Sequence, residues 1–298
     1  MASHSATAAS GHIILPFDLR VNPDAFHEPE NLKLLQSIFP RNYGLSSDGM
    51  FLCFVQAEMP PKPWPKSVAG LPPYFTLDLL ERMPGLIGNI VPIGNGSIAS
   101  DLNGRDMVDW EPLFVIVRNH FREIGISITE VMYWRDYLVV ILQHRIVLRT
   151  KLPREAGNIR VFYRCEDEME RLSTPQSRCE TDTRPEYQVL LQRLTHAKGR
   201  RTGDFVFLVA SDTDLTEGSF KVTSFQRVEE QWVFTIWLYM GQDSTDAYSP
   251  PYGSAIWTAD GDVLGFVRYA PRVGLMKDWC AGIAADEFID RGGLLHNC

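Results

Sequence analysis

Polar and aromatic side chains gather around one loop in the C-terminal third of the chain, residues 242–252. This is the longest stretch there without a strand pattern, and such loops often carry function. Asp246 and Tyr252 carry groups that can move a proton, and His144, which follows an apolar run, is a third candidate for acid–base catalysis. We expect a pocket beside them with binding residues Tyr248, Ser254, Trp237, Trp257 and Tyr239.

The remaining reactive residue types predict neither a metal ion nor a cofactor. None of the seven histidines has a second ligand at metal-binding spacing on a convincing element. The five cysteines are scattered without a C-x-x-C pair, which argues against structural zinc and against a disulfide framework. The glycine-rich stretch 93–106 matches neither the dinucleotide-binding nor the P-loop spacing.

Charge and hydropathy limit the classes of partner. The net charge is −8, from 29 basic and 37 acidic residues without a basic block, which disfavours DNA or RNA as a partner. No apolar run approaches the length of a membrane span, and residues 1–12 lack the apolar segment of a signal peptide. We therefore expect a soluble, cytoplasmic protein that binds a small apolar molecule or a protein partner.

The first part of the chain mixes helix and strand patterns. Apolar spacing predicts a helix over residues 28–39, and the run 50–56 predicts a buried strand. Six prolines make residues 58–73 an extended connector. A capped amphipathic helix is expected between residues 109 and 125, and it is followed by a strand hairpin that turns at Arg135–Asp136.

The last part of the chain is rich in strand patterns. After a helix expected from Thr183, short apolar segments follow one another from Asp204 onward with turn signals between them. The Asp-Gly step within Thr258–Asp262 predicts a hairpin turn, and a short helix is expected at residues 286–291.

The predicted fold class is α+β, with a mixed α/β N-terminal part and an antiparallel, barrel-like, β-rich C-terminal part. The expected organisation is a disordered lead over residues 1–12, a mixed region over 13–182 and a β-rich region over 183–298.

Residues 204–292 resemble the C-terminal barrel of the trypsin-like serine proteases. In that family a Gly-Asp-Ser-Gly segment precedes an apolar strand, a turn with glycine, a second strand and a closing helix. Here Gly253–Trp257, Asp260–Gly261 and Val263–Phe266 are similar to the first strand, the turn and the next strand. Cys280–Ala284 with the closing turn of helix is similar to the end of the family's barrel.

The chain departs from the family at the residues that carry the chemistry. Tyr252 stands at the nucleophile position, and Pro250 and Pro251 replace residues whose backbone shapes the oxyanion hole. Proline has no N–H to donate to an oxyanion. No segment resembles the family's general-base motif. The resemblance therefore implies a trypsin-like scaffold without serine-protease activity.

Two functions remain open on this sequence. The first is a non-proteolytic binding or interaction protein, a pseudoenzyme on a trypsin-like scaffold. The second is a cofactor-independent enzyme, such as an isomerase, cyclase or hydrolase, which holds a small substrate in an aromatic-lined apolar pocket.

Overall fold

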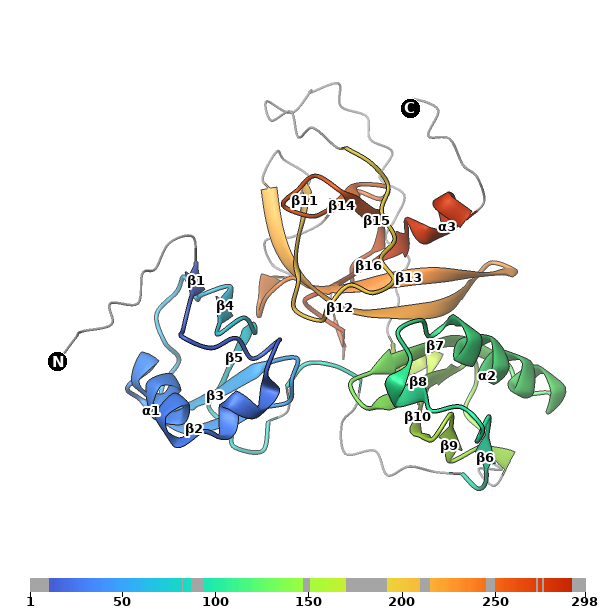
Figure 1. The fold of residues 1–298 in the computed structure, drawn as a ribbon, viewed down its shortest axis with the longest axis horizontal. Helices are drawn as coiled ribbons and strands as arrows, with labels where there is room; N and C mark the ends of the chain where they lie inside the picture. Colours follow the sequence, from blue (N-terminus) through green and yellow to red (C-terminus); the bar gives the residue numbers. More distant parts are fainter. Residues whose placement is uncertain are drawn as a thin grey trace. The chain divides into compact units, whose positions relative to one another are not determined.

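The computed structural model describes residues 11–81, 83–86, 94–146, 151–169, 192–209, 215–244, 250–271, 273–274 and 276–290 (Figure 1). The chain forms two compact units, Met1–Met83 with Arg201–Gly203, and Pro84–Arg200 with Asp204–Cys298. The boundary expected at residues 182/183 lies outside the described residues and stays a prediction. Of the lead expected over residues 1–12, residues 1–10 also lie outside the described part, whereas His12 lies in a short strand, β1 His12–Ile13.

In its described residues the first unit combines one α-helix and one 3-10 helix with two small sheets (Figure 1). β2 pairs antiparallel with β3, which pairs parallel with β5, and β1 pairs parallel with β4. The helix and the buried strand expected from the sequence are both confirmed. Their bounds, with the other elements of the unit, are β1 His12–Ile13, a 3-10 helix at Pro23–His27, α1 Pro29–Ile38, β2 Asn42–Ser47, β3 Leu52–Gln56, β4 Ser67–Val68 and β5 Pro73–Thr76.

The proline-rich connector does not form a helix, because proline removes backbone donors and fixes φ. It contains no helix and includes the two-residue strand β4. Trp64 holds it against the core of the unit: its indole N–H donates to the Pro60 carbonyl over 2.9 Å, and its ring lies 5.3 Å from that of Phe75.

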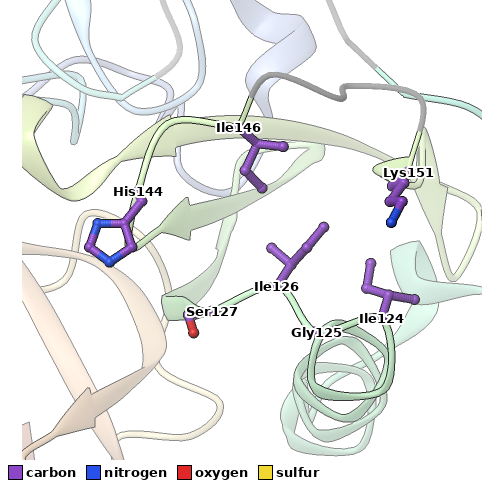
Figure 2. A pocket seen from close by; sticks show the side chains of 7 residues that line it. All are labelled: Ile124, Gly125, Ile126, Ser127, His144, Ile146 and Lys151. Carbon is purple, nitrogen blue, oxygen red and sulfur yellow. The ribbon is translucent and has the colours of Figure 1, made fainter.

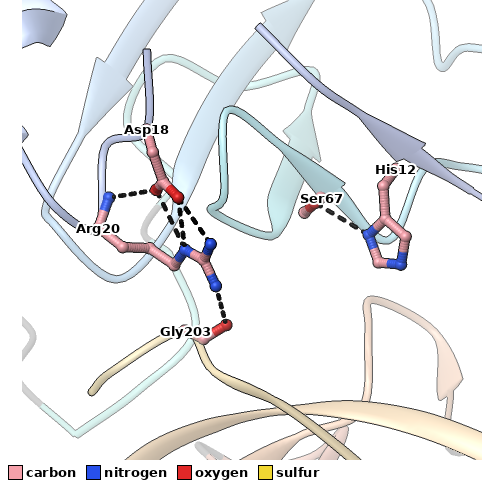
Figure 3. Close-up of polar contacts among 5 residues, drawn as sticks. All are labelled: His12, Asp18, Arg20, Ser67 and Gly203. Atoms are coloured by element: carbon pink, nitrogen blue, oxygen red, sulfur yellow. Dashed lines mark hydrogen bonds and ion pairs between the residues drawn. The ribbon is translucent and has the colours of Figure 1, made fainter. Parts of the chain in front are cut away.

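An ion pair within the N-terminal segment of this unit also hydrogen-bonds Gly203 (Figure 3). The Arg20 guanidinium donates to both carboxylate oxygens of Asp18, at 2.6 to 3.2 Å, and also to the Gly203 carbonyl over 3.4 Å. A Cβ at Gly70 would lie 2.2 Å from the Asp18 carboxylate, and one at Gly203 would lie 2.6 Å from Arg20. The two glycines therefore leave the space that this pair occupies. Beyond the pair, His12 hydrogen-bonds Ser67 across β1 and β4 at 3.0 Å.

This ion pair predicts a pH-dependent contribution to stability. Hydrogen bonding from Arg20 lowers the pKa of the Asp18 carboxyl below its ordinary 3.8, against the opposing effect of burial. A carboxyl whose pKa is lowered in the folded state stabilises the protein at pH values above its ordinary pKa. That stability is lost as the pH falls through the folded-state pKa. A third of the Asp18 side chain is exposed, so solvent screens the pair and we expect about 1 kcal/mol at pH 7.

Arg20→Met tests this contribution. We expect faster hydrogen exchange over residues 11–22 at pH 7, and a shallower loss of protection between pH 5 and pH 2 than in the unmodified protein (about 1 kcal/mol in total). Arg41→Met is the matched control, because Arg41 pairs with Glu58 on the surface of the same unit and both side chains are mostly exposed. Equal effects of the two substitutions would contradict the prediction.

In its described residues the second unit contains one large sheet, two α-helices and short 3-10 helices (Figure 1). Its elements are β6 Ser97–Ile98, a 3-10 helix at Gly104–Asp106, α2 Glu111–Glu123, β7 Ile128–Trp134, β8 Tyr137–Leu142, β9 Glu155–Ala156, β10 Ile159–Cys165, a 3-10 helix at Glu166–Glu168, β11 Phe205–Val209, β12 Leu215–Val228, β13 Gln231–Tyr239, β14 Ala255–Trp257, β15 Val263–Tyr269, β16 Trp279–Ala284 and α3 Asp286–Asp290.

The strand order of the large sheet is β11-β14-β15-β16-β13-β12-β7-β8-β10-β9-β6. β11 also pairs antiparallel with β12, so the part from β11 to β16 is ring-like. All pairings within this part are antiparallel, as the C-terminal strand pattern predicts. β7 pairs with β12, so strands from both sides of the expected 182/183 boundary share one sheet.

The amphipathic helix and the hairpin after it are confirmed. Asp109 accepts a hydrogen bond from the Glu111 amide at the start of α2, and Gly125 follows the helix at φ 69°. The apolar side of α2 packs into the same hydrophobic core as β7 and β8. β7 and β8 pair antiparallel through Trp134↔Tyr137, which leaves Arg135–Asp136 as the two-residue turn.

The fold is α+β, since in the described part of the chain three α-helices accompany a large, mainly antiparallel sheet. Within residues 192–199 the expected helix is absent, and Leu194 instead forms a parallel bridge with Val263. The start of that expected helix, residues 183–191, lies outside the described part of the chain.

Candidate functional site

The hairpin of β14 and β15 frames the segment that resembles the protease motif. The Thr258 amide donates to the Asp262 carbonyl over 2.9 Å, which confirms the predicted turn. Gly265 allows a close approach of two backbones, because a Cβ there would lie 2.4 Å from the Ile283 carbonyl oxygen. Gly253 is required for a different reason: a Cβ there would meet nothing within 4 Å, but its φ of 84° lies in the left-handed region that favours glycine.

Residues 250–254 use their backbone donors within the protein. The two prolines have no N–H, the Gly253 amide donates to the Val267 carbonyl over 2.8 Å, and the Ser254 amide donates to the Pro251 carbonyl over 3.2 Å. Tyr252 is the remaining residue of this segment with an N–H. An oxyanion hole needs preorganised donors aimed at one oxygen, and this segment offers at most one.

The predicted residues on this hairpin differ in exposure. Tyr252 is 66% exposed at the tip of the segment, Ser254 is half-buried, and Trp257 is 6% exposed in the core of the unit. Asp246 and Tyr248 lie outside the described residues. Tyr252 and Ser254 therefore lie on a surface segment that leads into β14.

The other predicted aromatic residues, Trp237 and Tyr239, lie inside the second unit on β13. Trp237 is completely buried, and its indole N–H donates to a Glu130 carboxylate oxygen over 2.9 Å and to the Ser224 hydroxyl over 3.2 Å. The Ser224 hydroxyl also donates to Glu130. Tyr239 is 1% exposed and packs edge-on against Trp279, at 5.5 Å between ring centres.

The sequence reasoning did not select Glu130. The carboxylate is completely buried in β7, where its partners come from β12 and β13. The available signal was a glutamate inside an otherwise apolar strand pattern, Ile128–Trp134. A buried carboxylate needs hydrogen-bond partners from elsewhere in the fold, so such a glutamate indicates a polar cluster between strands.

His144 lies at a different place, in a surface pocket of about 400 Å³ (Figure 2). The pocket is lined by Ile124, Gly125, Ile126, Ser127, His144, Ile146 and Lys151. Its apolar lining is aliphatic, and none of the other predicted site residues contributes to it. The structure therefore does not bring His144 together with Tyr252 in this pocket.

A second histidine, His196, has a fixed ring orientation. Its Nδ1 lies 3.1 Å from Oδ1 of Asp286, a carboxylate that is 1% exposed and also accepts the Ala197 amide over 2.7 Å. Nearby, Lys198 donates to Glu111 over 2.7 Å. Partial burial opposes the charge on Lys198, but this bond and the carboxylates around it raise the pKa of Lys198 overall. The arrangement ties residues 196–198 to α2 and α3.

Within the described ranges, no cluster of three His, Cys, Asp or Glu side chains is arranged to hold a metal ion. No helix there has the length and apolar character to cross a membrane. Comparisons with protein-family models, with curated proteins and with solved structures find no match for this chain.

Proposed function

We propose that this chain is a non-proteolytic binding protein on a degenerate trypsin-like scaffold, and that the segment before β14 presents Tyr252 to a protein partner. On this proposal the ring-like part of the sheet corresponds to the family's C-terminal barrel. The chemistry of proteolysis is lost, and the loop that would carry the nucleophile serves as a contact surface.

The observation that supports this proposal is the backbone of residues 250–254. Two prolines and two internally bonded amides leave no pair of donors for an oxyanion. The side chain at the nucleophile position is instead a tyrosine with 66% of its surface exposed. Tyrosine supplies a large contact area with few rotatable bonds and is enriched at the centres of protein interfaces.

Substitutions at Tyr252 separate binding from catalysis. We expect Tyr252→Ala to weaken capture of the protein partner by about tenfold, and Tyr252→Phe to retain it, because the ring rather than the phenolic proton supplies most of the contact. The measurement is quantitative pull-down from an extract of the source cells, followed by titration with the purified partner. His144→Ala is the control and should bind like the unmodified protein.

Two results would overturn this function. Equal binding by the unmodified protein and Tyr252→Ala would remove the proposed contact. Covalent labelling of the chain by a fluorophosphonate, with trypsin as the positive control, would show an activated serine that the proposal excludes.

A cofactor-independent enzyme acting on a small molecule is the second candidate. The observation that favours it is that His144 lines a pocket large enough for a small organic molecule. Turnover that is abolished by His144→Ala or Tyr252→Phe in a folded protein would support this candidate in place of the first.

A further inference from the structure

We propose that the pocket beside α2 (Figure 2) binds a small aliphatic carboxylate, with the Lys151 ammonium holding the carboxylate and three isoleucines holding the chain. The site is separate from the Tyr252 segment, because none of residues 250–254 lines it. The inference therefore goes beyond the proposed protein contact and does not depend on it.

The frame of the pocket is fixed by the backbone of the chain. The amides of Ile124, Gly125 and Ile126 donate to carbonyls of the last turn of α2, over 2.9 to 3.2 Å. The Gln143 amide donates to the Ser127 carbonyl over 3.0 Å, which ties the end of β8 to the residue before β7. These carbonyl groups at the end of α2 are therefore hydrogen-bonded within the chain, so a ligand in the pocket would contact the side chains around the helix end.

The floor of the pocket is aliphatic. Figure 2 shows the side chains of Ile126 and Ile146 between His144 on one side and Lys151 on the other, with Ile124 beside Lys151. All three isoleucines are half-buried, so they keep apolar surface that a ligand can remove from water. Gly125 adds no side chain, and a Cβ at this position would meet nothing within 4 Å.

The polar groups of the lining select the charge of the ligand. They are the Lys151 ammonium, the His144 imidazole and the Ser127 hydroxyl, all on exposed residues. Among the described residues that line it there is no carboxylate, although Glu123 directly precedes Ile124 in the chain. An ammonium without a competing carboxylate in the same pocket favours an anion, and the isoleucines favour an aliphatic body. A single carboxylate on a short alkyl chain satisfies both.

The size of the pocket is consistent with such a ligand. Its volume of about 400 Å³ lies within the range of about 300 to 1,000 Å³ that is typical of small-molecule sites. Lys151 and His144 lie on opposite sides of Ile126 and Ile146 (Figure 2). A ligand with its carboxylate at Lys151 would therefore extend along these isoleucines toward Ser127 and His144.

Methyl NMR of the full-length protein labelled at isoleucine tests the proposal with octanoate, hexanoate and acetate as probes. We expect octanoate to shift the methyl resonances of Ile124, Ile126 and Ile146 in a saturable way. Affinity should rise by about fourfold per added CH₂ while the chain lengthens inside the pocket. Acetate should bind too weakly to saturate, and octylamine, which has the same chain and the opposite charge, should not shift these methyl groups.

Lys151→Met provides the matched variant, because it keeps most of the aliphatic side chain and removes the charge from an exposed residue. We expect its Kd for octanoate to rise about fivefold. Lys277→Met, which removes an exposed lysine of the same unit outside the pocket, should leave the Kd unchanged. Equal binding of octylamine, an unchanged Kd in Lys151→Met, or octanoate shifts confined to other isoleucines would each overturn the proposal.

Discussion

Replacing Trp237 by alanine is expected to lower the free energy of unfolding by about 4 kcal/mol, within the range found for buried Trp→Ala substitutions. The indole is completely buried and lies edge-on to Tyr269, with 5.5 Å between ring centres. Its N–H also donates hydrogen bonds to Glu130 and Ser224. The alanine variant therefore loses packing, leaves a cavity and removes a donor from a buried carboxylate. Urea denaturation followed by circular dichroism measures the change.

Trp237→Phe separates the two contributions. Phenylalanine keeps most of the ring volume but has no N–H, so we expect a loss of about 2 kcal/mol from the unfilled hydrogen bond to Glu130. Trp232→Ala is the control on the same strand, since Trp232 is half-buried and packs against Phe225 at 5.2 Å. A loss in Trp237→Ala no larger than that in Trp232→Ala would show that the buried cluster does not stabilise the sheet.

The second large effect is expected at Gly265. Gly265→Ala should lower the free energy of unfolding by about 3 kcal/mol, at the upper end of the usual cost of overpacking. The added Cβ would lie 2.4 Å from the Ile283 carbonyl oxygen, which is backbone of the paired strand β16, and 3.0 Å from an Ile236 methyl group. A rotamer change cannot relieve a contact with backbone, so the strand pair itself has to shift.

Gly253→Ala is the matched comparison in the same hairpin. Its Cβ would enter open space, but its φ of 84° is unfavourable for alanine, so we expect a loss of about 1 kcal/mol. Thermal unfolding of both variants measures the difference. If Gly253→Ala were the more destabilising substitution, the close approach of β15 and β16 at Gly265 would not be the reason that a glycine is required there.

Many elements of the fold could be predicted because their signals are local. The closely spaced prolines of residues 58–73 exclude the interior of a helix, since each lacks a donor and fixes φ. The apolar spacing over Glu111–Glu123 and the turn chemistry at Thr258–Asp262 also act over a few residues, and both elements form where they were expected. Such signals do not depend on which other strand or helix lies nearby.

The candidate site was less predictable because it depends on contacts between distant parts of the chain. The aromatic pattern of β13 indicates burial but not its partners, so Trp237 was expected to line a pocket and instead hydrogen-bonds a glutamate 107 positions away in sequence. His144 was grouped with Tyr252, yet the pocket it lines is made by the end of α2 and the residues around β7 and β8. Neither arrangement has a local sequence signal.

The sequence by itself determined the α+β class, the antiparallel character of the C-terminal strands, and the loss of backbone donors at Pro250 and Pro251. Each follows from covalent properties or short-range periodicity. The tertiary structure decided that β7 and β12, which lie on either side of the expected 182/183 boundary, belong to one sheet. It also decided that Glu130 is buried among strands and that Lys151 and three isoleucines share a pocket. These features depend on strand order, because pairing between distant segments is set by the packing of the whole core rather than by any segment alone.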